Sequence, residues 1–303
     1  MSRVAYVNGR YLPHAAAAVH IEDRGYQFAD GVYEVCEVRG GRLIDEARHG
    51  RRLDRSLREL RIDMPMSPAA LGAVLREVVR FNRVEDGLVY LQITRGVAPR
   101  DHAFPLKEVR PSVVVTAHRL DSKARQKRAE QGIAVITVPD NRWDRVDIKT
   151  VGLLPNVLAK QAARDAGAYE AWFVDRDGRV TEGSSTNAWI VSADGVLLTR
   201  QAERGILRGI TRTVLLDATA ANAIRLEERA FTVSEAHGAR EAFITSATAT
   251  VTPVIAIDGK AISGGKPGKV TRQLQEAFYR HAEVAPLRSG PAVDGLQRGH
   301  FPR

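Results

Sequence analysis

Two side chains that lie far apart in the sequence could together perform amine chemistry on a carbonyl compound. Lys149 lies in residues 146–150, where apolar and polar residues alternate as in a strand. Glu182 lies in the sequence Thr-Glu-Gly-Ser-Ser, which predicts a tight turn leading into a strand. An amine withdrawn from water becomes a usable nucleophile toward aldehydes. A carboxylate directed at a pyridine nitrogen keeps that nitrogen protonated, which makes the ring an electron sink.

Lys149 differs from the other lysines in its surroundings. Lys160 falls on an amphipathic helical pattern, and the remaining lysines lie in charged or glycine-rich stretches. Only Lys149 has apolar neighbours in a strand pattern, namely Val146 and Ile148. A strand lysine can also lay its stem along apolar surface and leave its amine in water. This segment alone leaves that alternative open.

A series of motifs extends the pattern over most of the chain. They are EDRGYQFADGVYE (22–34), HxxRL (49–53), YLQITRG (90–96), DIK (147–149), NVLAK (156–160), TEGSSTN (181–187) and GILRGITR (205–212). In this order they resemble the fold-type-IV family of pyridoxal-phosphate enzymes, from about Tyr6 to Lys269. That family includes branched-chain and D-amino acid aminotransferases and aminodeoxychorismate lyase. The chain is most similar to the D-amino acid aminotransferases.

The resemblance implies pyridoxal 5′-phosphate (PLP) as the cofactor. Lys149 would carry it as a Schiff base and move a proton between the substrate α-carbon and the cofactor. Glu182 would pair with the ring nitrogen, and Leu207 would pack on one face of the ring. The phosphate would be bound by Arg52, Gly209, Ile210, Thr211, Ser246 and Ala247. Taken singly, Arg52 could instead be a solvated helix arginine and Leu207 a core residue.

Substrate choice is expected to rest on the loop 99–105. Arg100 and His102 lie two residues apart, and together they could bind one carboxylate through charge-assisted hydrogen bonds. The resemblance implies that this loop binds the substrate carboxylate and reaches in from a neighbouring subunit. Tyr33 would add a hydroxyl, and Trp143 would form a wall of the pocket. A solvated loop pair is the alternative for Arg100 and His102.

The implied reaction is a reversible, ping-pong transfer of an amino group from a D-amino acid, such as D-alanine, to a 2-oxo acid, such as 2-oxoglutarate. The implied assembly is a homodimer with the active site near its interface. Three enzymes of the same fold remain as alternatives: a branched-chain L-amino acid aminotransferase, an (R)-amine transaminase and aminodeoxychorismate lyase. A basic binding protein on a degenerate scaffold is disfavoured, because Lys149, Glu182 and Arg52 are all present.

Composition argues against several other classes. The net charge of +9 could suit a nucleic-acid partner, but the basic residues are mostly arginines dispersed along the whole chain, so we expect none. The single cysteine, Cys36, excludes an internal disulfide and a cysteine-based zinc site, and we expect no metal. The sequence lacks an apolar signal core and an apolar run of membrane-spanning length. We therefore expect a cytoplasmic protein without membrane association.

The elements that must position these residues indicate an α+β fold of two domains with the cofactor in the cleft between them. Asn8-Gly9 and Gly40-Gly41 predict hairpins, and Ser67-Pro68 predicts a helix start. Further strands are expected at 88–95, 112–118, 133–138, 146–150, 242–246 and 253–257, and paired strands at 170–175 and 187–199 with turns at Asp177-Gly178 and Asp194-Gly195. Helices are expected around 53–60 and at 156–166, 210–223 and 267–282. We expect a small N-terminal α/β domain at 1–120, a polar linker at 121–131, a larger pseudo-barrel domain at 132–284 and a disordered tail at 285–303.

Overall fold

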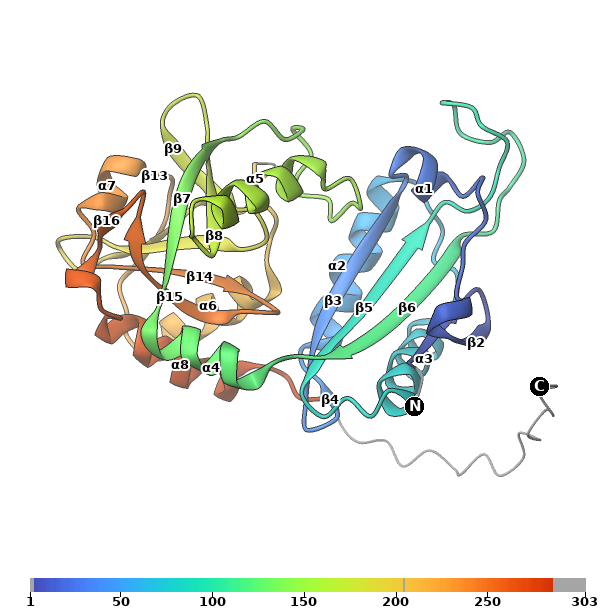
Figure 1. Cartoon of the computed structure of the whole chain (residues 1–303), viewed down its shortest axis with the longest axis horizontal. Helices are drawn as coiled ribbons and strands as arrows, with labels where there is room; N and C mark the ends of the chain where they lie inside the picture. Colours follow the sequence, from blue (N-terminus) through green and yellow to red (C-terminus); the bar gives the residue numbers. More distant parts are fainter. Residues whose placement is uncertain (1–2, 204, 286–303) are drawn as a thin grey trace.

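The computed structural model describes residues 3–203 and 205–285, which form two bodies, each built on one β-sheet (Figure 1). The N-terminal body has six antiparallel strands in the order β2-β1-β6-β5-β3-β4. Helices α2 and α3 pack against this sheet. The elements are β1 (Val4–Val7), β2 (Arg10–Pro13), η1 (His14–Ala16), α1 (Arg24–Phe28), β3 (Gly31–Arg39), β4 (Arg42–Leu43), α2 (Glu46–Glu59), α3 (Pro68–Phe81), β5 (Gly87–Thr94) and β6 (Ser112–Arg119).

Local signals in the sequence account for several of these boundaries. Asn8 and Gly9 both have positive φ, 46° and 94°, as the two-residue turn between β1 and β2 requires. The Ser67 hydroxyl accepts a hydrogen bond from the Ala70 N–H at 3.2 Å and caps α3, with Pro68 at the first helical position. The first predicted hairpin and the helix start at residue 67 are thus confirmed.

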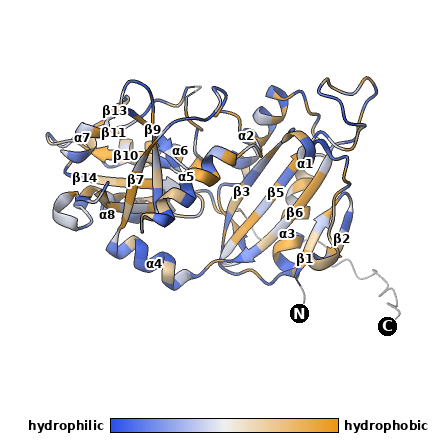
Figure 2. Cartoon of the chain, turned by 45° about the horizontal axis from the view of Figure 1, so that its top comes forward, coloured by the Kyte–Doolittle hydropathy of each residue, from blue (hydrophilic) through white to orange (hydrophobic). Residues whose placement is uncertain are grey.

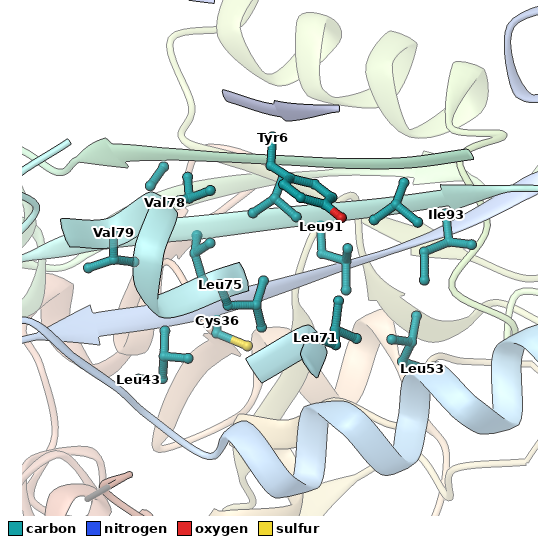
Figure 3. Packing of buried hydrophobic residues seen from close by; sticks show 14 of the residues in the cluster. Tyr6, Cys36, Leu43, Leu53, Leu71, Leu75, Val78, Val79, Leu91 and Ile93 are labelled. Atoms are coloured by element: carbon teal, nitrogen blue, oxygen red, sulfur yellow. The ribbon is translucent and has the colours of Figure 1, made fainter. Parts of the chain in front are cut away.

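The core of the N-terminal body lies between its sheet and the two helices (Figure 3). Leu53 and Leu57 of α2 are each 1% exposed, and Leu71 and Leu75 of α3 are nearly as buried. Burying a leucine side chain contributes about 1.5–3 kcal/mol. This packing holds α2 in one orientation, and therefore also holds the polar residues of α2 that face away from the core.

The C-terminal body has a curled, half-barrel sheet of ten strands. The strand order is β12-β11-β10-β14-β15-β7-β8-β9-β13, with β16 on β15; β7 pairs in parallel with both β8 and β15. Trp172 and Trp189 are fully buried in its core. The elements are β7 (Ile133–Pro139), α5 (Leu154–Asp165), β8 (Glu170–Val174), β9 (Arg179–Gly183), β10 (Asn187–Val191), β11 (Leu197–Thr199), α6 (Ile210–Ala221), β12 (Leu226–Glu228), β13 (Phe231–Thr232), α7 (Val233–His237), β14 (Glu241–Ser246), β15 (Thr250–Ile257), β16 (Lys260–Ala261), η2 (Ser263–Gly265) and α8 (Lys269–His281).

The polar segment expected as the linker forms a helix, α4 (Ser122–Gln131), which lies in the chain between β6 of the N-terminal body and β7 of the C-terminal body. The Asp121 carboxylate accepts from the Ala124 N–H at 3.0 Å and caps the helix, which ends at Gly132 with φ +80°. Figure 2 shows mainly hydrophilic residues along α4. Charged residues suit a surface helix as well as a loop, so the polar composition alone does not give the conformation of this segment.

The segment that carries Lys149 is not a strand, which corrects the prediction of a strand at 146–150. Residues 144–147 form turns, and only Thr150 makes an isolated antiparallel bridge, to Val32 of β3. The Tyr33 N–H donates to the Lys149 carbonyl at 3.0 Å. The alternating pattern therefore reflects attachment to the outer edge of β3 and not a full strand.

A buried polar contact joins the two bodies. Arg125 of α4 lies 2.7 Å from the Glu37 carboxylate of β3, and the Tyr279 hydroxyl of α8 donates to Glu37 at 2.9 Å. Arg125 also donates to the Tyr279 hydroxyl at 2.8 Å. These bonds hold the N-terminal sheet against α4 and α8, which sets the position of the cleft between the bodies.

Two further expectations concern the tail and membranes. The expected disordered tail lies, from residue 286 onward, outside the described residues. Across residues 3–203 and 205–285, the helices include none that is long and apolar enough to cross a membrane.

Candidate active site

A cavity of about 880 Å³ lies between the two bodies and collects nearly all of the residues singled out in the sequence. Its volume is in the range of pockets that bind cofactors and other small molecules. Arg100 is the only one of the expected site residues that does not line it. Those that do are Tyr33, Arg52, His102, Trp143, Lys149, Glu182, Leu207, Gly209, Ile210, Thr211, Ser246 and Ala247.

Lys149 is held at the cavity by the edge of β3. Its amine lies 4.0 Å from the centre of the Tyr33 ring, in cation–π contact. Before it, the buried Asp147 carboxylate binds Arg145 at 2.9 Å and also binds Arg55 of α2. The main chain is thus tied on both sides of Lys149, so the amine is confined to the cavity rather than extended into solvent.

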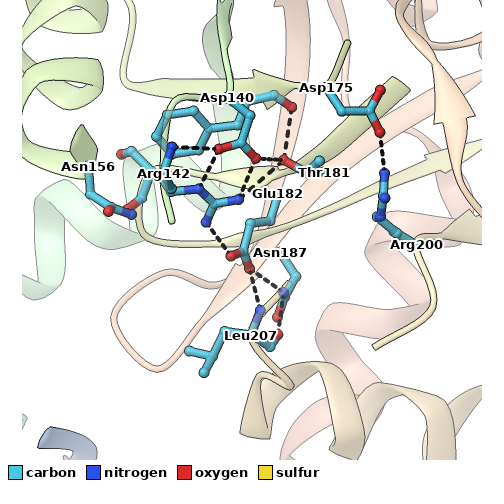
Figure 4. Close-up of polar contacts among 11 residues, drawn as sticks. Asp140, Arg142, Asn156, Asp175, Thr181, Glu182, Asn187, Arg200 and Leu207 are labelled. Atoms are coloured by element: carbon cyan, nitrogen blue, oxygen red, sulfur yellow. Dashed lines mark hydrogen bonds and ion pairs between the residues drawn. The ribbon is translucent and has the colours of Figure 1, made fainter. Parts of the chain in front are cut away.

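Glu182 lines the same cavity and is only 5% exposed. Figure 4 shows its polar contacts. Arg142 donates to one carboxylate oxygen at 2.5 Å, and the Leu207 N–H and the Asn187 amide donate to the other, each at 3.1 Å. Burial raises the pKa of Glu182 above its usual range, and Arg142 opposes that rise. The carboxylate is therefore fixed in place by three donors.

Arg142 is a functional candidate that the sequence reasoning missed. Asp140 accepts two hydrogen bonds from it, at 2.9 and 2.7 Å, and its guanidinium lies 4.4 Å from the centre of the Phe173 ring. Its side chain is 4% exposed. The Asp140-x-Arg142 pair beside Trp143 was the available signal, but the sequence does not show that Arg142 turns toward Glu182.

Arg52 belongs to a buried ionic cluster with Glu34 and His49. Two guanidinium nitrogens of Arg52 donate to Glu34 at 2.8 and 2.7 Å, and His49 Nδ1 lies 2.7 Å from the same carboxylate. Burial opposes ionisation of Glu34, but Arg52 and His49 together hold its pKa well below the usual range. Glu34 was not predicted. The sequence signal for Glu34 is that it is a charged residue on the same strand face as Val32 and Cys36, which are buried.

The start of α6 offers an anion site. The first N–H groups of a helix have no intrahelical partner, and Gly209, at the N-cap, has no side chain to cover them. A Cβ at residue 209 would overlap the Asn187 side chain, so the backbone approach requires glycine. Ile210, Thr211 and Ser246 surround this helix end in the same cavity. Together these groups suit a phosphate.

The donor set of the cavity fits a ring cofactor that carries an aldehyde and a phosphate. It combines an amine, a fixed carboxylate and an anion site. The Thr186 hydroxyl also lines the cavity, is buried, and has no hydrogen-bond partner among the described residues. An unpaired buried hydroxyl is costly, so it is consistent with a site that receives a polar ligand.

The expected substrate loop lies at the mouth of the cavity. Arg24 holds it by donating to the Asp101 carbonyl at 2.6 Å. His102 lines the cavity, with its ring 5.5 Å from that of Phe28. Arg100 is exposed and stacks over Phe28, 4.6 Å from the ring centre. Within one chain, the structure therefore brings His102 to the site but leaves Arg100 outside it.

Comparison with solved structures shows the fold. The branched-chain amino acid aminotransferase of Escherichia coli superposes with a TM-score of 0.85 at 24% identity, covering 92% of this chain and 94% of that one. The branched-chain aminotransferase of the thermophilic archaeon Thermoproteus uzoniensis, solved with norvaline, gives a TM-score of 0.80 at 27% identity over the same shares.

Comparison of sequences is more specific. The chain is 44% identical to the D-alanine aminotransferase of Bacillus licheniformis over 89% of this chain and 94% of the relative. It is 41% identical to the D-alanine aminotransferase of Staphylococcus aureus (strain MSSA476), over 92% and 97%. The model of the family described as amino-transferase class IV matches residues 31–257. This chain belongs to the class IV aminotransferase family.

Proposed function

We propose that this protein is a PLP-dependent D-amino acid aminotransferase that converts D-alanine and 2-oxoglutarate to pyruvate and D-glutamate by a ping-pong mechanism. The observation that carries the proposal is the single cavity that holds the Lys149 amine, the Glu182 carboxylate and the helix start at Gly209. The substrate class is supported by relatives at 41–44% identity that are named D-alanine aminotransferases.

Each part of the cavity has a role in this reaction. PLP, when bound, supplies the electron sink that acidifies the substrate α-carbon. Lys149 would hold the cofactor covalently and would carry the proton at the substrate α-carbon. Glu182, oriented by Arg142, would pair with the ring nitrogen. Arg52, Thr211, Ser246 and the N–H groups at the start of α6 would hold the phosphate, and Leu207 would pack on the ring.

The branched-chain L-amino acid aminotransferase is the second candidate, because solved structures of branched-chain aminotransferases have the same fold. A paired assay of D-alanine and L-leucine, each with 2-oxoglutarate, separates the two functions. We expect faster turnover of D-alanine. Faster turnover of L-leucine would reject the D-specific proposal and favour the second candidate.

The proposed assembly is a homodimer, located in the cytoplasm, in which the 99–105 loop of one subunit serves the pocket of the other. Its support is the exposure of Arg100, which does not line the cavity of its own chain. Tyr33 and Trp143 line the cavity and would complete the substrate site.

Replacing Arg100 with alanine is expected to lower kcat/KM for D-alanine by about 10- to 100-fold. The physical reason is the loss of a charge-assisted hydrogen bond to the substrate carboxylate, worth roughly 1.5–3 kcal/mol. Arg100→Ala should lower kcat/KM much less for an (R)-amine that lacks a carboxylate. His102→Ala should also affect D-alanine more than the amine, but its loss of kcat/KM should be smaller. Steady-state kinetics on both substrates makes the measurement. Equal losses for amino acid and amine would show that the loop acts through structure alone.

A further inference from the structure

A second cavity, of about 660 Å³, opens beside the first and is rich in arginine. Six of its lining residues are arginines: Arg48, Arg51, Arg52, Arg55, Arg145 and Arg208. The lining carboxylates are three: Glu59, Asp147 and Glu203. The proposed transamination uses only Arg52 of this set, so the remaining cationic residues have no assigned role.

Four of the six lining arginines form ion pairs. Arg55 and Arg145 share Asp147 and Glu59, and Arg52 is paired with Glu34. Arg48 lies 2.9 Å from Asp217, outside the lining. Arg51 and Arg208 make no ion pair with any carboxylate of the described residues. Two guanidinium groups of this cavity are thus available to an anion.

The two unpaired arginines come from different bodies. Arg51 lies on α2 of the N-terminal body, and Arg208 lies in the segment before α6 of the C-terminal body. One guanidinium nitrogen of Arg208 donates to the Ala202 carbonyl at 3.2 Å, which restrains that side chain. The cavity therefore forms only when the two bodies pack together. Its positive charge comes from both bodies and not from a single helix.

The arginine cavity is separate from the cofactor cavity but touches it. Arg52 and Ile210 line both cavities. Arg52 uses two nitrogens for Glu34 and donates from the third to the Arg208 carbonyl at 3.0 Å. Three of the five N–H donors of Arg52 are used by Glu34 and the Arg208 carbonyl, and the proposed function assigns the remaining donors to the cofactor phosphate. That cavity must therefore rely on Arg51 and Arg208.

We propose that the arginine cavity binds a phosphate-bearing anion at a site distinct from the cofactor phosphate site. Planar guanidinium groups form paired hydrogen bonds with phosphate oxygens, and arginine is the preferred residue for such recognition. The volume is in the range of small-molecule pockets, and the buried Ile206 adds an apolar wall that inorganic phosphate would not need. The ligand class is accordingly a phosphate ester, with free phosphate as the weaker ligand of the same site.

The test measures binding of adenosine 5′-monophosphate and of inorganic phosphate to holoenzyme saturated with PLP, by equilibrium dialysis. Saturation occupies the cofactor phosphate site, and no amino substrate is present, so the result does not depend on the proposed transamination. Arg51→Gln and Arg208→Gln are each expected to weaken binding by about 10-fold or more, because a charge-assisted bond is lost. Added salt should weaken binding further.

Arg58→Gln is the matched control. Arg58 lies on the same helix, is 74% exposed and does not line the cavity. The Arg58→Gln variant should bind the probe as the wild type does. All variants should keep the visible absorbance of bound PLP. Absence of saturable binding at millimolar probe would overturn the proposal. Equal affinities of Arg51→Gln and Arg58→Gln would also overturn it, as would release of PLP by the probe.

Discussion

Replacing Lys149 with alanine is expected to abolish the visible absorbance of the covalently bound cofactor and to lower turnover by at least about 1,000-fold. In the proposed mechanism the same amine forms the bond to the cofactor and moves the proton at the substrate α-carbon, so one substitution removes both functions. A 1,000-fold loss corresponds to about 4 kcal/mol of barrier. Absorbance spectra and single-turnover kinetics of the purified variant make the measurement.

Lys160 provides the control, because it is the other lysine that lines the cavity. Its amine donates to the Tyr169 carbonyl at 2.5 Å and lies 3.5 Å from the Glu170 carboxylate, so it is already engaged. Lys160→Ala should retain the covalently bound cofactor. Borohydride reduction followed by peptide mapping identifies the modified lysine, and a label on Lys160 would reject the assignment of Lys149.

Replacing Glu34 with glutamine is expected to destabilise the protein by about 3–5 kcal/mol. The substitution leaves Arg52 buried without its ionic partner, and an uncompensated buried charge is costly. Urea unfolding at fixed, saturating PLP gives the free energy of unfolding. Cofactor affinity should fall as well, because the Arg52 guanidinium, proposed to bind the cofactor phosphate, loses the carboxylate that fixes its orientation.

Asp54→Asn is the matched control for this experiment. Asp54 pairs with Arg58 on the same helix, but both side chains are at least half exposed. Its loss should cost no more than about 1 kcal/mol. A similar small cost for Glu34→Gln would show that the buried cluster contributes little to stability.

The Glu34 cluster also predicts a pH dependence. The pKa of Glu34 is held below that of the unfolded chain, which is near 4.3. Its contribution to stability is therefore fully present above about pH 5 and is lost progressively as the pH falls through the unfolded pKa toward the lower folded pKa. The difference between wild type and Glu34→Gln should be constant near neutral pH and should shrink only in acid.

Much of the local structure could be predicted from the sequence. The Asn8-Gly9 hairpin and the Ser67-Pro68 helix start depend on backbone preferences and capping within a few residues, and such signals act in any context. The order of the motifs was enough to identify the family, which the comparisons confirm. Neither the local turn and cap signals nor the order of the motifs depends on long-range packing.

Other features needed the tertiary structure. Alternation around Lys149 indicated a strand, yet the segment is a turn held by one bridge to Val32. Charged composition at 121–131 indicated a linker but not its conformation, which is a helix capped by Asp121 and held by contacts with α8; Gln275 of α8, for example, donates to the Ala129 carbonyl. In both cases contacts with residues distant in the sequence contribute to the conformation.

The sequence by itself determined which chemistry the chain can perform, because the amine, the carboxylate and the glycine-bounded helix start are encoded by residue type. Only the tertiary structure decided how these groups are supported. Arg142 is recognisable as the partner of Glu182, and Glu34 as the partner of Arg52, only when strands and helices far apart in the chain have packed. The physical reason is that burial makes each ion pair obligatory, and burial is a property of the whole fold rather than of any single segment.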